Sequence, residues 1–348
     1  MDMEIAICEG PQQIRLERRP VETLRPADVL VHIACCGVCP WDVRAYNGLS
    51  SSVRYPLQLG HEVAGAVAAV GVDVRDLEVG DRVAVDVIRR CGVCRACRRG
   101  FENLCERADS SRGGFAEYIV MPAKNVYRLR DGTKLIEASL AEPLACVVRG
   151  QRRVSVTAGD TALVMGCGPL GLLHIQALKG SGARVIGADL LDRRLAVARR
   201  LGADATVNPG QQDLSQVVAT ETEGAGVDVA IVAVSQIEAA RQALPQLGGG
   251  GRLLLFAGIY PKAELVLDPN LIHYRELLIT GTSDYTAAEF AAALRLIQDG
   301  IVQTAPLISR LYPLAEVAPA LASVSAREGL KTVVRCSDLE PFEPEVIP

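Results

Sequence analysis

The chain has 348 residues, of which 49% are hydrophobic and 22% charged, which is typical of a folded soluble protein large enough for two domains. Its net charge of −4 and the lack of a long basic run argue against a nucleic-acid partner. Asp2 and Glu4 open the chain, and no apolar run approaches the ~18 residues of a membrane span. We therefore expect neither a signal peptide nor a membrane partner.

The first part of the sequence, residues 1–145, predicts a compact β-rich domain. Strand-like segments lie close together at 29–34, 64–70, 81–87 and 115–120. Glycine or charged turn residues bound them, which is typical of short strands.

The next part, residues 146–284, predicts an α/β domain with a doubly wound parallel sheet. Apolar strand runs occur at 161–165, 184–188, 227–234, 251–256 and 277–280, and the first two are followed by helical segments at 170–179 and 193–201. Strands that alternate with helices form βαβ units, in which the strands run parallel.

The last part, residues 285–348, begins with an alanine-rich helix at 287–299. Strand-like runs follow at 307–308 and 332–334. We expect these strands to return to the first domain.

Four of the eleven cysteines lie in one short stretch: Cys91, Cys94, Cys97 and Cys105. Four thiolates at this spacing can fill all positions of a tetrahedral ion, so the stretch predicts a closed, structural zinc site. Thiols in a long chain without a secretion signal also favour metal binding over disulfides, and a reducing cytoplasm as the compartment.

The segment Gly166-Cys167-Gly168-Pro169-Leu170-Gly171 carries the pattern G-x-G-x-x-G between a predicted strand and a predicted helix. Gly166 allows the tight turn, Gly168 lets the backbone approach a pyrophosphate, and Gly171 lets helix and strand pack closely. The pyrophosphate would rest on the helix N-terminus. Asp189 ends the next strand and can accept hydrogen bonds from both adenosine ribose hydroxyls. Because its charge repels a 2′-phosphate, we expect NAD rather than NADP.

Sulfur, nitrogen and oxygen donors for a second metal ion are present in Cys39, His61, Glu62 and Glu142. A catalytic zinc takes about three protein ligands and keeps one position open for water or substrate. Spacing alone does not separate this hypothesis from ordinary structural roles.

The segments Gly60-His61-Glu62, Gly113–Tyr118 and Glu142-Pro143-Leu144, together with the four-cysteine loop, resemble the zinc-dependent medium-chain dehydrogenases. The polyol (sorbitol) and threonine dehydrogenase branch is the most similar, over about residues 4–336. The resemblance implies a GroES-like catalytic domain, a Rossmann domain and a homodimer or homotetramer. It also implies two zinc ions per chain and the oxidation of a secondary alcohol, such as a polyol, cyclitol, sugar derivative or amino alcohol, with hydride transfer to NAD.

The same resemblance assigns roles to individual residues. The counterparts of Cys39, His61 and Glu62 bind the catalytic zinc, and that of Glu142 binds the metal or its water. Asp42 would orient His61 through its second ring nitrogen. The cofactor site would further include Arg194 at the adenosine ribose, and Ala257, Gly258, Ile259, Ser283, Asp284 and Tyr285 along the nicotinamide.

The stretch Cys39-Pro40-Trp41-Asp42-Val43-Arg44 departs from the family pattern, which places a serine or threonine and a histidine where Trp41 and Arg44 stand. Those family residues relay the substrate proton, whereas indole only donates and arginine does not titrate usefully. We hypothesise that Trp41 forms an apolar wall for a ring-like substrate and that Arg44 binds a substrate carboxylate or phosphate. The alternatives are a packing role for Trp41, and for Arg44 a surface ion pair or a contact with the cofactor phosphates.

Only seven residues separate Cys105 from Gly113, fewer than in the resembled family, which predicts a more open substrate pocket or a different specificity. Two other functions stay open at this point. One is a carbonyl reductase that runs the reaction backwards with NADH, and the other is a zinc- and NAD-binding subunit whose catalysis is impaired by Trp41 and Arg44. The two metal-ligand sets argue against a zinc-free quinone reductase.

Overall fold

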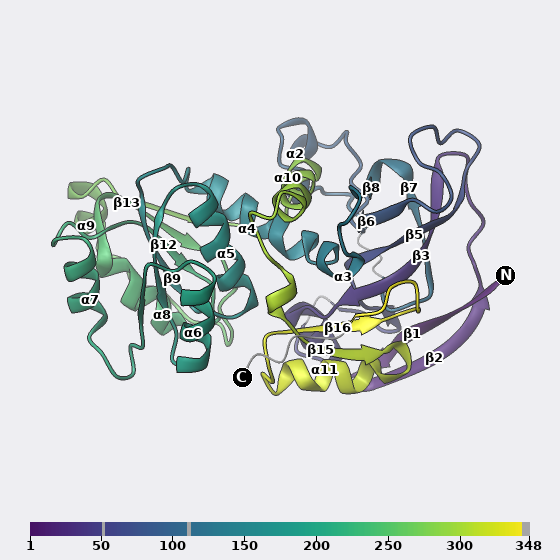
Figure 1. Cartoon of the computed structure of the whole chain (residues 1–348). Helices are drawn as coiled ribbons and strands as arrows, with labels where there is room; N and C mark the ends of the chain where they lie inside the picture. Colours follow the sequence, from purple (N-terminus) through teal and green to yellow (C-terminus); the bar gives the residue numbers. More distant parts are fainter. Residues whose placement is uncertain (51–52, 110–112, 343–348) are drawn as a thin grey trace. The chain divides into compact units, whose positions relative to one another are not determined.

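The computed structural model describes residues 1–50, 53–109 and 113–342 (Figure 1). The fold divides into two units, of which one comprises Met1–Ala145 with the chain from Thr286 onward, and the other Cys146–Tyr285. Each unit has its own set of buried apolar side chains. In the described part of the chain, no helix is both long and apolar enough to cross a membrane.

The first unit contains a seven-stranded sheet that joins strands from both ends of the chain. Its neighbours follow the order β15 (Ile308–Pro313), β16 (Lys331–Arg335), β3 (Asp28–Gly37), β5 (Glu62–Val70), β6 (Arg82–Asp86) and β8 (Val126–Arg128), and β7 (Tyr118–Pro122) also pairs with β3. The C-terminal strand β16 runs antiparallel to β3, with Val334 opposite Cys36. The tail therefore returns to the first unit.

A smaller sheet in the same unit has the order β2 (Gln13–Pro20), β1 (Asp2–Gly10), β4 (Leu57–Gln58). The sequence analysis did not predict β1 and β2. In β2 the charged residues Arg15, Glu17 and Arg19 alternate with Ile14 and Leu16, and no residue of the strand is fully buried. The apolar signal of a half-exposed strand is weak.

Short helices complete the first unit: α1 (Pro40–Tyr46), α2 (Arg95–Arg98), α3 (Leu135–Ala138), α10 (Ala287–Gln298) and α11 (Val317–Ser325). The helix α4 (Ala141–Arg153) begins in the first unit and carries the chain into the second. α10 begins with a capping box, in which Thr286 and Glu289 satisfy the free N–H groups of the first turn.

The second unit contains a six-stranded, fully parallel sheet, which confirms the predicted doubly wound fold. Its order is β11 (Ala205–Val207), β10 (Arg184–Ala188), β9 (Thr161–Met165), β12 (Val227–Val232), β13 (Leu247–Leu255), β14 (Leu278–Gly281). The helices of this unit are α5 (Pro169–Gly180), α6 (Asp192–Arg200), α7 (Leu214–Glu221), α8 (Ile237–Ala243) and α9 (Pro269–Tyr274). The strand order reverses beside β9, and this switch point is where open α/β sheets bind ligands.

A substitution at Leu163, at the centre of β9, tests how strongly the core of the second unit contributes to stability. Its side chain is fully buried in the apolar cluster of this sheet. We expect Leu163→Ala to lower the free energy of unfolding by about 2–5 kcal/mol, because it removes buried methyl groups and leaves a cavity. The matched control is Leu190→Ala, because the side chain of Leu190 is 68% exposed. This change should shift the free energy of unfolding by less than about 0.5 kcal/mol. Chemical denaturation of both variants measures the difference, and equal effects would contradict this view of the core.

Candidate active site

Cys39, His61 and Glu62 come together in the first unit. Cys39 caps the N-terminus of α1, His61 directly precedes β5, and Glu62 opens that strand. One potential ligand atom from each residue lies within 4.8 Å of those of the other two. A thiol, an imidazole and a carboxylate at this separation form a donor set suited to a zinc ion with a fourth position open.

The buried carboxylate of Asp42 links the two segments that supply these donors. Its Oδ1 lies 3.3 Å from His61 Nδ1 and accepts a hydrogen bond from the Gly60 N–H at 3.1 Å, while Oδ2 accepts one from the Cys39 N–H at 3.0 Å. The imidazole is thus oriented with its other nitrogen, Nε2, available to the ligand group. Burial lowers the pKa of His61, but Asp42 and the Cys39 sulfur outweigh burial and hold this pKa well above its ordinary value.

Lys331, on β16, is a site residue that the sequence analysis missed. Its Nζ donates to Glu62 Oε1 at 2.5 Å and to the Val38 carbonyl at 3.0 Å, and both charged side chains are buried. Burial lowers the pKa of Lys331, but the charges of Glu62 and Cys39 raise it above its usual value. The second oxygen of Glu62, Oε2, is buried without a hydrogen-bond partner among the described residues. An orphaned carboxylate oxygen inside this donor set fits a bound cation.

Gly37 of β3 has no side chain, and the carboxylate of Glu62 occupies the space that a side chain would fill. Gly37 is paired with Glu62 across the two strands, and a Cβ at Gly37 would lie 1.9 Å from Glu62 Oε2. Any side chain at this position would displace the carboxylate, so glycine is required by close approach.

Glu142 lies in the first turn of α4 and is buried, but it is not one of the three residues grouped around the potential metal position. Its negative charge contributes to the raised pKa of Lys331. Glu142 therefore belongs to the electrostatic surroundings of the ligand group.

The four loop cysteines also come together: one sulfur from each of Cys91, Cys94, Cys97 and Cys105 lies within 4.8 Å of the others. Hydrogen bonds from the backbone N–H groups of Val93 and Cys94 lower the pKa of Cys91 to about 6, whereas burial raises that of Cys97 to about 12. Four thiols that face one another, partly stabilised as thiolates, fit the closed tetrahedral site expected for structural zinc.

Trp41 lies next to the metal-ligand candidates. Its ring meets the imidazole of His61 edge to face, with ring centroids 6.3 Å apart. Trp41 also lines a cavity of about 630 Å³ in the first unit. Arg44 lies on the same helix, half-buried, but it is not among the described residues that line this cavity.

The glycine segment of the second unit turns at the end of β9 and opens α5. Gly166 has a φ of +101°, and a Cβ at Gly171 would lie 1.8 Å from the Gly166 carbonyl oxygen, so both positions require glycine. Asp189, at the end of β10, accepts hydrogen bonds from the N–H groups of Cys167 at 2.8 Å and Leu191 at 2.9 Å. Arg194 lies 3.8 Å from the same carboxylate, and its Nε is buried without a partner among the described residues. This arrangement can cradle an adenosine ribose and the adjoining phosphates.

The residues expected along the nicotinamide follow two further strands of the parallel sheet. Ala257, Gly258 and Ile259 come after β13, and Ser283, Asp284 and Tyr285 come after β14. Because the sheet is parallel, these segments lie at the carboxyl ends of the strands, as the glycine turn does.

Comparisons with known proteins agree with both units. Residues 25–131 match the alcohol dehydrogenase GroES-like domain, and residues 169–299 match the zinc-binding dehydrogenase family. The chain is 33% identical to a sorbitol dehydrogenase of Bacillus subtilis (strain 168), over 92% of this chain and 93% of that one. It is 34% identical to an L-threonine 3-dehydrogenase of Pyrococcus horikoshii, over 82% and 84% of the two chains.

Among solved structures, a putative zinc-binding dehydrogenase from Sinorhizobium meliloti 1021, bound to NADP, superposes with a TM-score of 0.90 at 28% identity. The match covers 96% of this chain and 99% of the other. The chain therefore belongs to the zinc-dependent medium-chain dehydrogenase family, in its polyol and threonine dehydrogenase branch, and is an oxidoreductase that acts on CH–OH groups with a nicotinamide cofactor.

Proposed function

We propose that the chain oxidises a secondary alcohol, such as a polyol, cyclitol, sugar derivative or amino alcohol, to a ketone with NAD as the hydride acceptor. The observation that carries this proposal is the group of half-buried Cys39 and buried His61 and Glu62, in which Glu62 Oε2 has no hydrogen-bond partner among the described residues. Zinc bound by these residues would polarise the substrate oxygen as a Lewis acid, and NAD would carry the hydride chemistry.

The chain's own residues hold the site in order. Asp42 keeps the His61 ring in one orientation, and Lys331 holds one oxygen of Glu62 and offsets part of the negative charge of the ligand set. Trp41 cannot accept the substrate proton, because its indole nitrogen only donates, and the guanidinium of Arg44 has no hydrogen-bond acceptor. We propose that Glu142 or a water molecule accepts this proton.

We propose NAD rather than NADP because Asp189 lies at the end of β10, where a 2′-phosphate would meet its negative charge. The homodimeric or homotetrameric state, the cytoplasmic compartment and the direction of the reaction stay predictions from the sequence.

A substrate screen tests the reaction directly. Polyols, cyclitols, amino alcohols and their phosphates are incubated with NAD or NADP, and the matching ketones with the reduced cofactors, while nicotinamide absorbance is followed. We expect turnover of at least one of these alcohol classes. A failure of every alcohol and ketone in a preparation that holds both metal ions would instead support the impaired subunit.

The two metal sites are tested by the zinc content of single variants. We expect two zinc ions per chain in the unmodified protein. Cys39→Ser should retain one zinc ion and lose turnover, because it removes a ligand of the open site. Cys94→Ser should also retain one ion, but lower the melting temperature, because a structural zinc stabilises its loop. Elemental analysis and thermal melts are made on both variants, so that each is the control for the other. Two zinc ions per chain in Cys39→Ser would exclude Cys39 as a ligand of the catalytic zinc.

Cofactor choice is tested at Asp189. Asp189→Gly removes both the acceptor for the ribose hydroxyls and the charge that repels a phosphate. We expect the ratio of kcat/KM with NAD to that with NADP to fall at least about tenfold, which corresponds to roughly 1.4 kcal/mol. Steady-state kinetics with a fixed alcohol give the ratio. A wild-type preference for NADP would show that Asp189 does not select the cofactor.

A further inference from the structure

Lys331 and Glu62 form a buried ion pair in which only one of the two carboxylate oxygens takes part. Lys331 Nζ donates to Glu62 Oε1 at 2.5 Å and to the Val38 carbonyl at 3.0 Å. The other oxygen, Oε2, is buried and has no hydrogen-bond partner among the described residues. The two oxygens of this carboxylate are chemically alike, so their different surroundings decide which of them is available to a metal ion.

Both members of the pair are held in place by the strands around them. A Cβ added to Gly37 would lie 1.9 Å from Glu62 Oε2 and 2.9 Å from the carboxylate carbon, so the carboxylate lies close against the backbone of β3. On the other side, the Val38 N–H donates to the Thr332 carbonyl at 2.9 Å, next to the hydrogen bond from Lys331. β16 therefore fixes Nζ beside Oε1 through the same segment that leads to Cys39.

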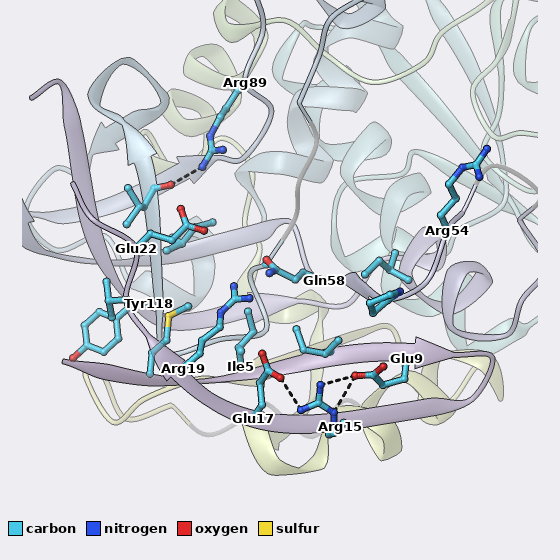
Figure 2. Close-up of a pocket in the computed structure, with 18 of the residues that line it drawn as sticks. Ile5, Glu9, Arg15, Glu17, Arg19, Glu22, Arg54, Gln58, Arg89 and Tyr118 are labelled. Carbon is cyan, nitrogen blue, oxygen red and sulfur yellow. Dashed lines mark hydrogen bonds and ion pairs between the residues drawn. The ribbon is translucent and has the colours of Figure 1, made fainter. Parts of the chain in front are cut away.

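The arginines of the cavity that Trp41 lines do not supply this compensating charge (Figure 2). Arg15 forms ion pairs with Glu9 and Glu17, which Figure 2 shows as dashed lines. Neither Glu62 nor Lys331 is among the described residues that line the cavity. The ion pair with Lys331 is therefore separate from the charges around the cavity.

We propose that Lys331 is a positioning residue that makes Glu62 a one-oxygen ligand of the catalytic metal ion and so keeps the fourth coordination position open. With Oε1 engaged by Nζ, Oε2 is the oxygen left for the ion. A carboxylate that bound through both oxygens would fill the position that water or substrate needs. A lysine suits this role because an ammonium group donates from one point, whereas the planar fork of a guanidinium binds both oxygens of a carboxylate. This inference rests on the proposed function only for the presence of a metal ion at Cys39, His61 and Glu62.

The coordination of the site is measured without turnover when cobalt(II) occupies it and zinc is kept at the four-cysteine site. Lys331→Met removes the donor and frees Glu62 to bind through both oxygens. We expect this variant to retain cobalt but to bind imidazole, a neutral metal ligand, at least about tenfold more weakly in titrations followed by the cobalt absorption spectrum. Azide, an anionic ligand, should weaken by a similar factor. Weaker binding of azide alone would show that Lys331 acts only through its charge, and loss of the cobalt would show that it is needed to hold the ion; either result would overturn the proposal.

Lys331→Arg keeps the positive charge beside Glu62 and decides the question if Lys331→Met does not fold. Because a guanidinium can take both oxygens of Glu62, we expect a chelator to remove the metal ion of this site at a concentration at least about tenfold lower. Arg335→Met is the matched control, since Arg335 lies on the same strand with an exposed side chain. Its imidazole binding and metal affinity should equal those of the unmodified protein.

The outcomes separate this inference from the proposed function. Unchanged imidazole binding in a folded Lys331→Met variant, or unchanged metal affinity in Lys331→Arg, would overturn the role of Lys331 and leave the proposed oxidation standing. An unmodified protein that takes up no cobalt at this site would reject both. The expected changes in the two variants, without turnover of any alcohol, would uphold the role of Lys331 and reject the oxidation alone.

Discussion

The active site of this chain depends on the burial of two opposite charges, Lys331 and Glu62, next to a potential metal position. Removing one partner of a buried ion pair typically costs about 3–5 kcal/mol, because the other charge is left without compensation. Here the lysine is on the C-terminal strand β16 and the glutamate on β5, and both strands flank β3. The C-terminal strand therefore contributes to the candidate metal site, and β16 must pair with β3 before Glu62 has its ion-pair partner.

That closure also explains the geometry of the ligand group. Glu62 presents one oxygen to Lys331 and leaves the other without a partner among the described residues. Gly37, on the intervening strand, leaves room for the unpaired oxygen. Asp42 then holds His61 and the Cys39 backbone together. Each contact fixes one donor, so the position between the donors is set by the fold before any metal binds.

Local patterns made much of the fold and the site predictable from the sequence. The four thiols lie within one loop, and the glycine turn joins one strand to the next helix, so spacing alone indicates their geometry. The parallel sheet follows from alternating strand and helix segments, and the structure confirms it.

Contacts between distant segments could not be predicted in the same way. Lys331 lies 269 residues from Glu62, and a lysine at the start of an apolar strand is as compatible with solvent as with a buried acid. The role of Gly37 depends on the register between β3 and β5, which the sequence pattern does not specify. For Trp41 and Arg44, which share one helix, the sequence left substrate contacts open beside packing and ion-pair alternatives; Trp41 lines the cavity, and Arg44 is not among its described lining residues.

The metal-ligand candidates and most of the cavity lining are carried by different strands. Cys39 caps α1, His61 and Glu62 lie at the start of β5, and Lys331 lies on β16, whereas much of the cavity lining belongs to the smaller sheet of β1, β2 and β4. Trp41 belongs to both sets, because its ring contacts the imidazole of His61 and also lines the cavity. A change on β2 can therefore alter the lining of the cavity without leaving Glu62 or Lys331 unpaired. Because buried ion pairs tolerate little change and half-exposed strands tolerate much, the cavity lining in such a fold can vary while the buried pair of Glu62 and Lys331 is retained.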